Sequence, residues 1–307
     1  MRWHTDAVLE PRLSEEVATA LSDGVAVVAL ESTIFSNLGL PSPANAAALA
    51  RCTAAIRARG AVPAVTAVLD GVARVGLDDT EHDRILGPAR KAAERDLAVA
   101  VAQRWDFGAT TVSASVALAA SAGIEVFATG GIGGVHRGAE LTGDISADLD
   151  ALAHHAVITV CAGAKAFLDL ARTLEYLETV GVPVLGWCHD WFPAFYTRSS
   201  GLRVPHRIDS AVEVVATLRN RTRQTTGVLV GVPIPESDEL DADELDTVLH
   251  RALDECALAG VVGAAVTPFV LGRIAAATAG RSVPANLALA EHNAAVAAQV
   301  AVAVANG

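Results

Sequence analysis

The chain contains two lysines, and their scarcity makes them candidates for chemistry. Lys91 and Lys165 are the only lysines among 23 lysines and arginines, so nearly every positive side chain is an arginine. The two residue types replace one another where a solvated cation suffices, but only lysine readily loses its proton. We therefore interpret both lysines as candidate nucleophiles or proton carriers, with chance retention as the alternative.

The residues around Lys165 are typical of an imine-forming site. An apolar strand, Val157–Cys161, enters a turn of small residues, and Lys165 follows at the expected start of a helix. Apolar surroundings and a second cation such as Lys91 favour the neutral form of an amine. A neutral lysine attacks aldehydes and sugar anomeric carbons to form an imine. The alternative is a solvent-reaching lysine at a helix start, where the helix dipole disfavours a cation.

A glycine-rich segment, Thr129–Arg137, follows another apolar strand. His136 stands where the third glycine of a dinucleotide-binding motif would be, and no Gly-Lys-Ser/Thr follows as in a P-loop. Glycines let backbone N–H groups approach an anion, and His136 and Arg137 would add positive charge. The segment therefore indicates phosphate or sugar binding, unless the glycines serve only a tight turn.

Three carboxylates complete the set of candidate residues. Asp144 and Asp148 are four residues apart, a spacing typical of one helical face or a helix N-terminus. One of them could hold a hard cation that keeps its waters, although capping by Asp144 or Ser146 is the favoured interpretation. Glu31 ends an apolar strand, where burial would make it a proton donor, unless it is an exposed strand-end residue.

The rest of the sequence predicts the elements that position these residues. Apolar runs alternate with helical spacing, which favours one α/β domain over residues 1–307 with a mostly parallel sheet and helices on both faces. The expected strands are Val25–Leu30, Val62–Val68, Glu125–Ala128, Val157–Cys161, Val182–Gly186 and Gly227–Val232. The expected helices are Ala44–Arg59, Leu97–Arg104, Ala147–His154, Phe167–Thr179 and the C-terminal Ala285–Asn306. Ligands bind at the carboxyl ends of such strands, where Glu31, the glycine-rich segment and Lys165 fall.

Two further stretches are polar. Arg203–Asp209 is expected to be a surface loop, and the acidic stretch Glu236–Asp246 a solvated helix start.

Composition narrows the class of protein. The net charge is -12 over 307 residues, which argues against nucleic-acid binding. We expect no membrane span and no secretory signal, because no long uninterrupted apolar segment occurs. The spacing of the four cysteines is that of neither a zinc site nor a disulfide scaffold. Free thiols favour a cytoplasmic protein, and the cysteines are Cys52, Cys161, Cys188 and Cys256.

Several segments together resemble one family, the pseudouridine-5′-phosphate glycosidases, which are related to the indigoidine synthase A domain. The resemblance spans nearly the whole chain in order, and both lysines fall on it. The matching segments are Leu30–Ile34, Gly60–Ala64, Val68–Gly71, Lys91, Arg95–Leu97, Gly108–Val112, Val126–Gly138, Asp144–Leu149, Val160–Lys165, Thr173–Glu178, Phe192–Tyr196, Val266–Phe269 and Ala285–Leu289.

The resemblance implies an α/β/α sandwich, homotrimers and a role for each matching residue. Lys165 would open the ribose ring and hold C1 as an imine, and Glu31 would be the proton donor. Lys91 would contact substrate and move protons, and Asp144 would hold a manganese ion (Mn²⁺) largely through waters. The ribose-phosphate site would be lined by His136, Ser146, Ala147 and Asp148, and the base would lie near Val112 and Asn286.

The chemistry that follows is the formation or cleavage of a C-glycosidic bond. Such a bond lacks the basic oxygen or nitrogen that ordinary glycosidases protonate. An imine at C1 supplies an electron sink instead, and an acid such as Glu31 protonates the leaving carbon. The expected partners are ribose 5-phosphate and either uracil or another carbon-nucleophile acceptor.

The chain departs from the family pattern away from the sugar positions. In the loop 35–41, Leu38 stands where a histidine is usual. Val232 replaces an asparagine, and Ala92–Glu94 replaces a segment with Ser and Arg. Gly263-Ala264 stands where Gly-Lys is usual. Fewer hydrogen-bonding groups favour a larger apolar ring over uracil.

The preferred prediction is therefore C-ribosylation of an aromatic polyketide, as in the alnumycin offshoot of the family. Three alternatives stay open: release of uracil from pseudouridine 5′-phosphate, a non-catalytic sugar-phosphate binder, and an aldolase or isomerase of sugar phosphates that shares the imine.

Overall fold

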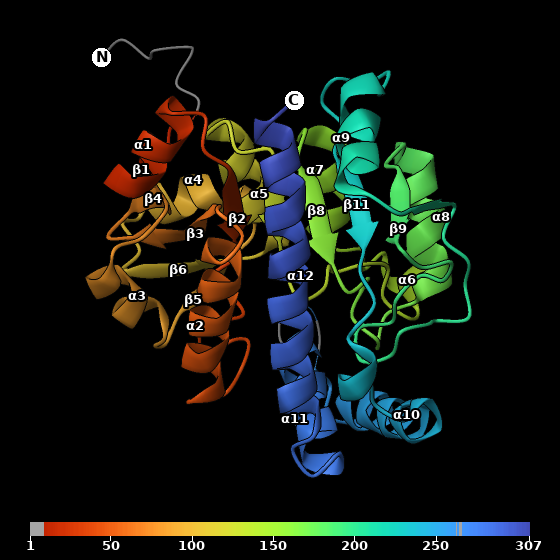
Figure 1. Ribbon diagram of the computed structural model, residues 1–307. Coiled ribbons are helices and arrows are strands. Elements are labelled where there is room, and N and C mark those ends of the chain that lie inside the picture. Colours follow the sequence, from red (N-terminus) through yellow and green to blue (C-terminus); the bar gives the residue numbers. More distant parts are fainter. Residues whose placement is uncertain (1–8, 262, 264–265) are drawn as a thin grey trace.

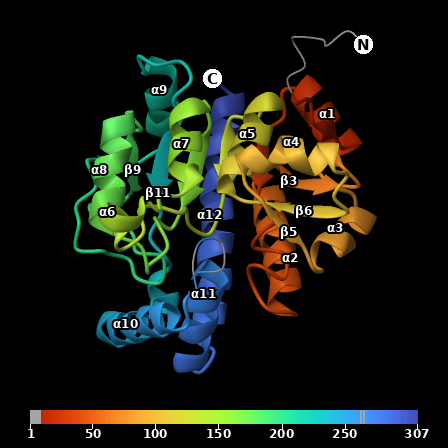
Figure 2. The same cartoon turned by 180° about the vertical axis from the view of Figure 1, so that it is seen from behind.

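The protein is a mixed β-sheet covered by helices on both faces (Figures 1 and 2). The computed structural model describes residues 9–261, 263 and 266–307. Within these residues the strand order is β1-β4-β3-β2-β7-β8-β11-β9-β10, and β6 pairs with β3 and β5. The strands are β1 Arg12–Leu13, β2 Val27–Leu30, β3 Val62–Leu69, β4 Val72–Val75, β5 Arg90–Ala92, β6 Phe107–Thr110, β7 Val126–Ala128, β8 Ile158–Cys161, β9 Val184–Trp187, β10 His206–Ile208 and β11 Val228–Gly231.

The described strand pairs are parallel except where β3 meets β4 and β6. The first half of β3 pairs with β2 in the parallel sheet, and its second half runs antiparallel to β4 and β6. Every residue of the central strands β2, β7, β8 and β11 is buried, and all of them are apolar or glycine except Thr159 of β8. The predicted mostly parallel α/β sandwich is confirmed.

The helices form two layers. On one face α12 packs against α2 and α9, and on the other α5 packs against α4 and α7 (Figures 1 and 2). The helices are α1 Glu15–Ser22, α2 Ala44–Arg57, α3 Asp79–Ile85, α4 Glu94–Ala102, α5 Val112–Ser121, α6 Ala139–Thr142, α7 Ala147–His154, α8 Leu170–Val180, α9 Ala211–Asn220, α10 Ala242–Leu258, α11 Val266–Ala277 and α12 Ser282–Ala305.

The long helix α12 is apolar because it lies in the core. By length and composition it could cross a membrane, but 61% of its most apolar window is buried in the protein. It crosses β2, β7 and β8 and packs along α2. A helix that is apolar on most sides is expected in such a position.

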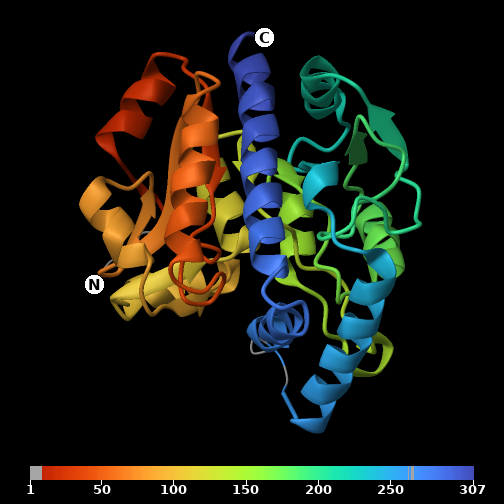
Figure 3. The same cartoon turned by 60° about the horizontal axis from the view of Figure 1, so that its bottom comes forward.

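The helices α10 and α11 pack against each other and project beyond the carboxyl ends of the central strands (Figures 1 and 3). This placement brings α11 over the edge of the sheet where ligands bind in α/β proteins.

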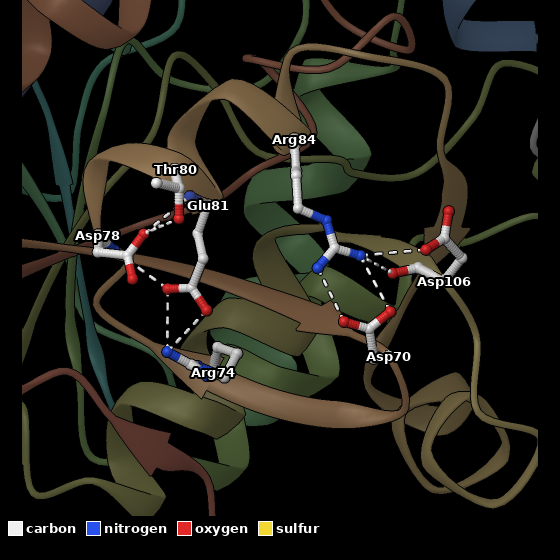
Figure 4. A network of polar contacts seen from close by, with 7 residues as sticks. All are labelled: Asp70, Arg74, Asp78, Thr80, Glu81, Arg84 and Asp106. Carbon is white, nitrogen blue, oxygen red and sulfur yellow. Dashed lines mark hydrogen bonds and ion pairs between the residues drawn. The ribbon is translucent and has the colours of Figure 1, made fainter.

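A network of ion pairs secures the corner that carries β4, α3 and β6 (Figure 4). The guanidinium of Arg84 donates to Asp70 at 2.8 and 3.1 Å and to the Asp106 carboxylate at 3.0 Å. Arg74 lies 2.8 Å from Glu81, and both side chains are largely buried. Asp78 begins α3 with a capping box that includes Glu81. The corner supports β6, which pairs with the strand that carries Lys91.

The strand predictions were incomplete at the sheet edges. The expected loop Arg203–Asp209 contains β10, which pairs with β9. Strand β5 has the sequence Arg-Lys-Ala, which carries no alternating pattern. It forms through pairing with β6 and through Arg90, which stacks on the Trp105 ring at 3.6 Å.

The expected helix Phe167–Thr179 begins later, at Leu170, because the Asp169 side chain accepts the N–H of Arg172 as its cap. Lys165 therefore lies in the loop before α8 and does not open a helix. The prediction for Glu236–Asp246 is confirmed in part, since α10 begins at Ala242 after the cap residue Asp241.

Candidate active site

A cavity of about 490 Å³ opens at the carboxyl end of the sheet. All of the predicted site residues lie on its wall, although they come from seven separate parts of the chain. They are Glu31, Lys91, Val112, His136, Asp144, Ser146, Ala147, Asp148, Lys165 and Asn286. The sheet therefore brings together side chains that the sequence only suggested would share one edge.

Glu31 follows directly after β2 and is 8% exposed. Burial raises the pKa of its carboxyl, although the ammonium of Lys165 and the hydroxyl of Thr129 oppose the rise. The Thr129 hydroxyl donates to Oε1 of Glu31, and the Thr129 carbonyl in turn accepts the Asn293 amide at 2.8 Å. A carboxyl held in this way is suited to donate a proton inside the cavity.

The turn that carries Lys165 is held by backbone hydrogen bonds on one side and by close packing on the other. The N–H of Lys165 donates to the Ile132 carbonyl at 3.1 Å, and the N–H of Ala162 donates to Gly130 at 3.0 Å. Gly163 has a φ of 77°, and a Cβ there would lie 2.0 Å from the Pro193 carbonyl oxygen. The turn is thus clamped between the glycine-rich segment and the loop after β9, which fixes the base of the lysine side chain.

Lys91 lies on β5, opposite Ala109 of β6, and keeps contact with solvent. Partial burial lowers the pKa of Lys91, and the nearby ammonium of Lys165 lowers it further, whereas Asp148 and Glu31 act in the opposite direction. A cation beside an amine disfavours its protonation, so the arrangement favours the neutral form of Lys91.

The glycines of the segment Thr129–Arg137 allow neighbouring residues to pack closely against its backbone. The N–H of Gly133 donates to Oδ2 of Asp148 at 2.8 Å, and the N–H of Ser113 donates to Oδ1 at 3.0 Å. A Cβ on Gly133 would lie 2.2 Å from Oγ of Ser146, and one on Gly131 would lie 2.5 Å from the Phe195 ring. The Gly133 amide is therefore engaged by Asp148, and the alternative interpretation, glycines kept for backbone geometry, holds at this position.

Asp148 and Ser146 both secure the start of α7. Ser146 is the N-cap, and its hydroxyl accepts the N–H of Asp148 at 3.3 Å. Asp148 is 6% exposed and holds two backbone amides. The expected N-cap is confirmed for Ser146. Asp148 and Ala147 both line the cavity.

His136 and Asp144 face each other across the cavity rim, with Nδ1 and Oδ2 3.8 Å apart. Burial lowers the pKa of His136, although Asp144 opposes this. Within the described ranges, no group of three or more His, Cys, Asp or Glu side chains could bind one metal ion. The half-exposed Asp144 carboxylate fits only an ion that keeps most of its waters.

Part of the cavity wall is apolar. It includes Ile34, Leu38, Phe195 and Leu271 beside Val112 and Asn286. Asn286 is buried, and its Oδ1 has no hydrogen-bond partner among the described residues. Leu38 lines the cavity as expected, but the fully buried Val232 does not contribute to the described wall, so that departure does not alter the pocket surface. Ala264 lies outside the described residues.

Sequence reasoning missed several wall residues. Arg95, Thr33, Thr111, Ser113, Phe167 and Thr267 also line the cavity. Arg95 belongs to Arg95–Leu97, one of the segments that resemble the family. That resemblance could have identified it as a wall residue. Arg137, expected to add charge beside the glycines, is exposed and is not part of the described wall.

An acid and two lysines that converge at the carboxyl edge of an α/β sheet form a candidate active site. The chain belongs to the family of indigoidine synthase A like proteins, whose model matches residues 16–303. A pseudouridine-5′-phosphate glycosidase of Methylobacterium nodulans is 51% identical over 94% of this chain and 86% of its own length. The enzyme of the same name from Nocardioides sp. is 50% identical over 94% and 95%.

Two solved structures share the fold. The prealnumycin C-glycosynthase AlnA, in complex with ribulose 5-phosphate, has a TM-score of 0.88 and 35% identity over 98% of both chains. An indigoidine synthase A-like protein from Thermotoga maritima has a TM-score of 0.87 and 33% identity over 99% of this chain and 100% of its own. The chain is therefore an enzyme of the glycosidase and glycosynthase type.

Proposed function

We propose that this enzyme makes or breaks a carbon–carbon bond at C1 of ribose 5-phosphate through an imine on Lys165. The observation that carries the proposal is the convergence of Glu31, Lys91 and Lys165 on one cavity. Relatives named for a C-nucleoside phosphate and a related C-glycosynthase bound to a pentulose phosphate support this chemistry. A non-catalytic binder would need neither an acid nor a pair of amines.

The cleavage direction starts when the Lys165 nitrogen bonds to C1 as the bond between C1 and the ring oxygen breaks. The ring oxygen takes up a proton, and Lys91 is placed to move it. The nitrogen lone pair then forms the imine as the bond from C1 to the base carbon breaks, and Glu31 protonates that carbon. Water hydrolyses the imine and releases the sugar as an aldehyde. Synthesis is the reverse of these steps.

Uracil is the first candidate for the ring that is released or attached. The relatives that share about half of their residues with this chain are pseudouridine-5′-phosphate glycosidases, whereas AlnA shares 35%. Overall similarity therefore reverses the preference drawn from the sequence departures. An aromatic polyketide acceptor is the second candidate, and it is favoured by Leu38 and Leu271 on the cavity wall.

The test supplies the purified enzyme with pseudouridine 5′-phosphate and, separately, with ribose 5-phosphate plus uracil or an electron-rich naphthoquinone. We expect the first mixture to yield ribose 5-phosphate and uracil. Chromatography and mass spectrometry detect both products. C-ribosylation of the naphthoquinone without turnover of pseudouridine 5′-phosphate would replace the first candidate by the second. Turnover of ribose 5-phosphate without any acceptor would indicate an aldolase or isomerase instead.

We also propose that Asp144 binds one Mn²⁺ ion, mostly through coordinated waters. When bound, the ion would offset negative charge of the sugar phosphate. We expect removal of metal by a chelator to raise the KM for the sugar phosphate and added Mn²⁺ to restore it. Asp144→Asn should weaken Mn²⁺ binding measured by electron paramagnetic resonance, and unchanged binding would exclude Asp144 as the ligand.

We further propose a single-domain, cytoplasmic enzyme that forms homotrimers. Three cysteines are buried and free, which suits a reducing compartment. Light scattering on the purified protein gives the subunit number, and a monomer at micromolar concentration would overturn the trimer.

A further inference from the structure

A cluster of four hydroxyl side chains is buried in the apolar core beside the strands that carry Glu31 and Lys91. Its members are Ser32, Thr66, Thr110 and Ser115, each of which is 0% exposed, and none belongs to the described cavity wall. A buried hydroxyl costs free energy unless it is hydrogen-bonded, whereas valine or alanine would fill the same space without that requirement. Four hydroxyls kept together in the core therefore indicate a use for the hydrogen bonds between them.

Thr110, the last residue of β6, is the centre of this hydroxyl cluster. Its Oγ1 donates to the Thr66 carbonyl at 2.8 Å and lies 2.8 Å from the Thr66 hydroxyl. The same atom lies 3.0 Å from the Ser32 hydroxyl and accepts the Ser32 N–H at 3.3 Å. The N–H of Thr110 in turn donates to the Ser32 hydroxyl at 2.9 Å. Thr110 and Ser32 therefore hold each other through side chain and backbone together.

The cluster lies where β2 and β6 both end beside the middle of β3. In the register, Leu30 of β2 is opposite Val65, and Ala109 of β6 is opposite Ala67. Thr66 lies between these two pairs as the one polar residue of β3, and its hydroxyl donates to the Leu30 carbonyl at 3.1 Å. Strands β2 and β6 do not pair with each other in the described sheet. The hydroxyl cluster thus joins two strand ends that the strand pairing leaves separate.

Each of the two strand ends positions one of the proposed proton-transfer groups. Glu31 directly precedes Ser32 at the end of β2. Lys91 directly precedes Ala92, which the register of β5 and β6 places opposite Thr110. Burial raises the pKa of Glu31, and the Lys91 ammonium is one of the charges that oppose this rise, so the two groups interact. The cluster therefore connects the backbone that holds the acid to the backbone that holds the proton carrier.

We propose that Thr110 is a positioning residue, whose hydroxyl holds the Glu31 carboxyl and the Lys91 amine in the arrangement that proton transfer requires. Small displacements of such groups have large effects on rate, because proton transfer needs a donor and an acceptor within hydrogen-bond reach. Lys165 is held separately, since its N–H donates to the Ile132 carbonyl. The inference rests on the proposed function for the roles of Glu31 and Lys91.

The experiment compares Thr110→Val, which removes the hydroxyl at nearly constant volume, with Thr110→Ser, which keeps it. The readouts are kcat and KM for cleavage of pseudouridine 5′-phosphate and the final yield of the ribose 5-phosphate adduct trapped on Lys165. We expect Thr110→Val to lower kcat about 10- to 100-fold, as a small misplacement of reacting groups does, while KM and adduct yield stay near the wild-type values. Thr110→Ser should restore most of the kcat. If the enzyme ribosylates the naphthoquinone instead, the same kinetics follow that reaction.

Thr159→Val is the matched control. Thr159 is as fully buried in β8 as Thr110 is in β6, but its hydroxyl has no hydrogen-bond partner among the described residues. Its removal should therefore leave kcat unchanged. Ser32→Ala removes one hydroxyl partner of Thr110 and should also lower kcat, so it tests the proposal even if Thr110→Val does not fold. Circular dichroism and the melting temperature identify the folded variants.

A wild-type kcat in the folded variants among Thr110→Val and Ser32→Ala would overturn the proposal. Equal losses of kcat and adduct yield would also overturn it, because a general loss of structure affects both. The proposed function fails separately: a wild-type protein without an adduct on Lys165, combined with a lowered kcat in Thr110→Val, would exclude the imine and keep the positioning role.

Discussion

Replacing Lys165 by alanine is expected to abolish the covalent adduct that borohydride traps from ribose 5-phosphate. The wild-type protein should gain the mass of one reduced sugar phosphate, and Lys165→Ala should gain none. Turnover should fall by about 10³-fold or more, because the substitution removes the nucleophile itself. Intact-mass spectrometry and steady-state kinetics on the same samples provide the measurement.

The second lysine is the matched control for this experiment. Lys91→Ala keeps the Lys165 amine and should still form an adduct, although more slowly, because a proton carrier is lost. Since the chain has two lysines, peptide mapping assigns the modified residue without ambiguity. An adduct on Lys91, or an unmodified wild-type protein that still turns over substrate, would contradict the imine on Lys165.

Replacing Glu31 by glutamine is expected to separate the two halves of the reaction. The adduct with ribose 5-phosphate should still form, because Lys165 is intact. Cleavage of pseudouridine 5′-phosphate should fall by about 10²- to 10⁴-fold, the usual contribution of a general acid. Loss of adduct and cleavage in equal measure would show that Glu31 supports sugar binding and not protonation of the leaving carbon.

The pH dependence tests the same assignment. Burial raises the pKa of Glu31, and the donor must be protonated, so cleavage is expected to decline as the pH rises through this raised pKa. The Thr129 hydroxyl donates to the carboxylate and opposes the rise. Thr129→Val removes that hydrogen bond at nearly constant volume and should therefore move the alkaline decline to higher pH. A decline that stays in place would remove Glu31 as the titrating group.

Much of the site was predictable because chemistry depends on residue type and on position along a strand. An apolar run that ends in Glu31, and another that ends shortly before Lys165, locate both groups at the carboxyl edge of a parallel sheet. Local patterns also predicted α7, with Ser146 as one of its two candidate caps. The segments that resemble the family then identified the ten predicted site residues, all of which line the cavity.

Other features could not be predicted, because they depend on contacts between distant segments. Strand β5 has no apolar pattern and forms by pairing with β6 and by stacking on Trp105. Lys165 lies in a loop because Asp169 caps α8 four residues further on. Val232 was expected to alter the pocket, but it is fully buried.

The amino-acid sequence by itself determined which groups can react, since two lysines, an apolar-flanked glutamate and the α/β alternation are local properties. Only the tertiary structure decided which side chains share the cavity and which are already engaged. Asp148 holds two backbone amides from other elements, whereas Arg95 faces the cavity and Arg137 does not. The physical reason is that contacts between residues far apart in the sequence determine the exposure and the hydrogen-bond partners of a side chain. A local sequence pattern contains no information about such contacts.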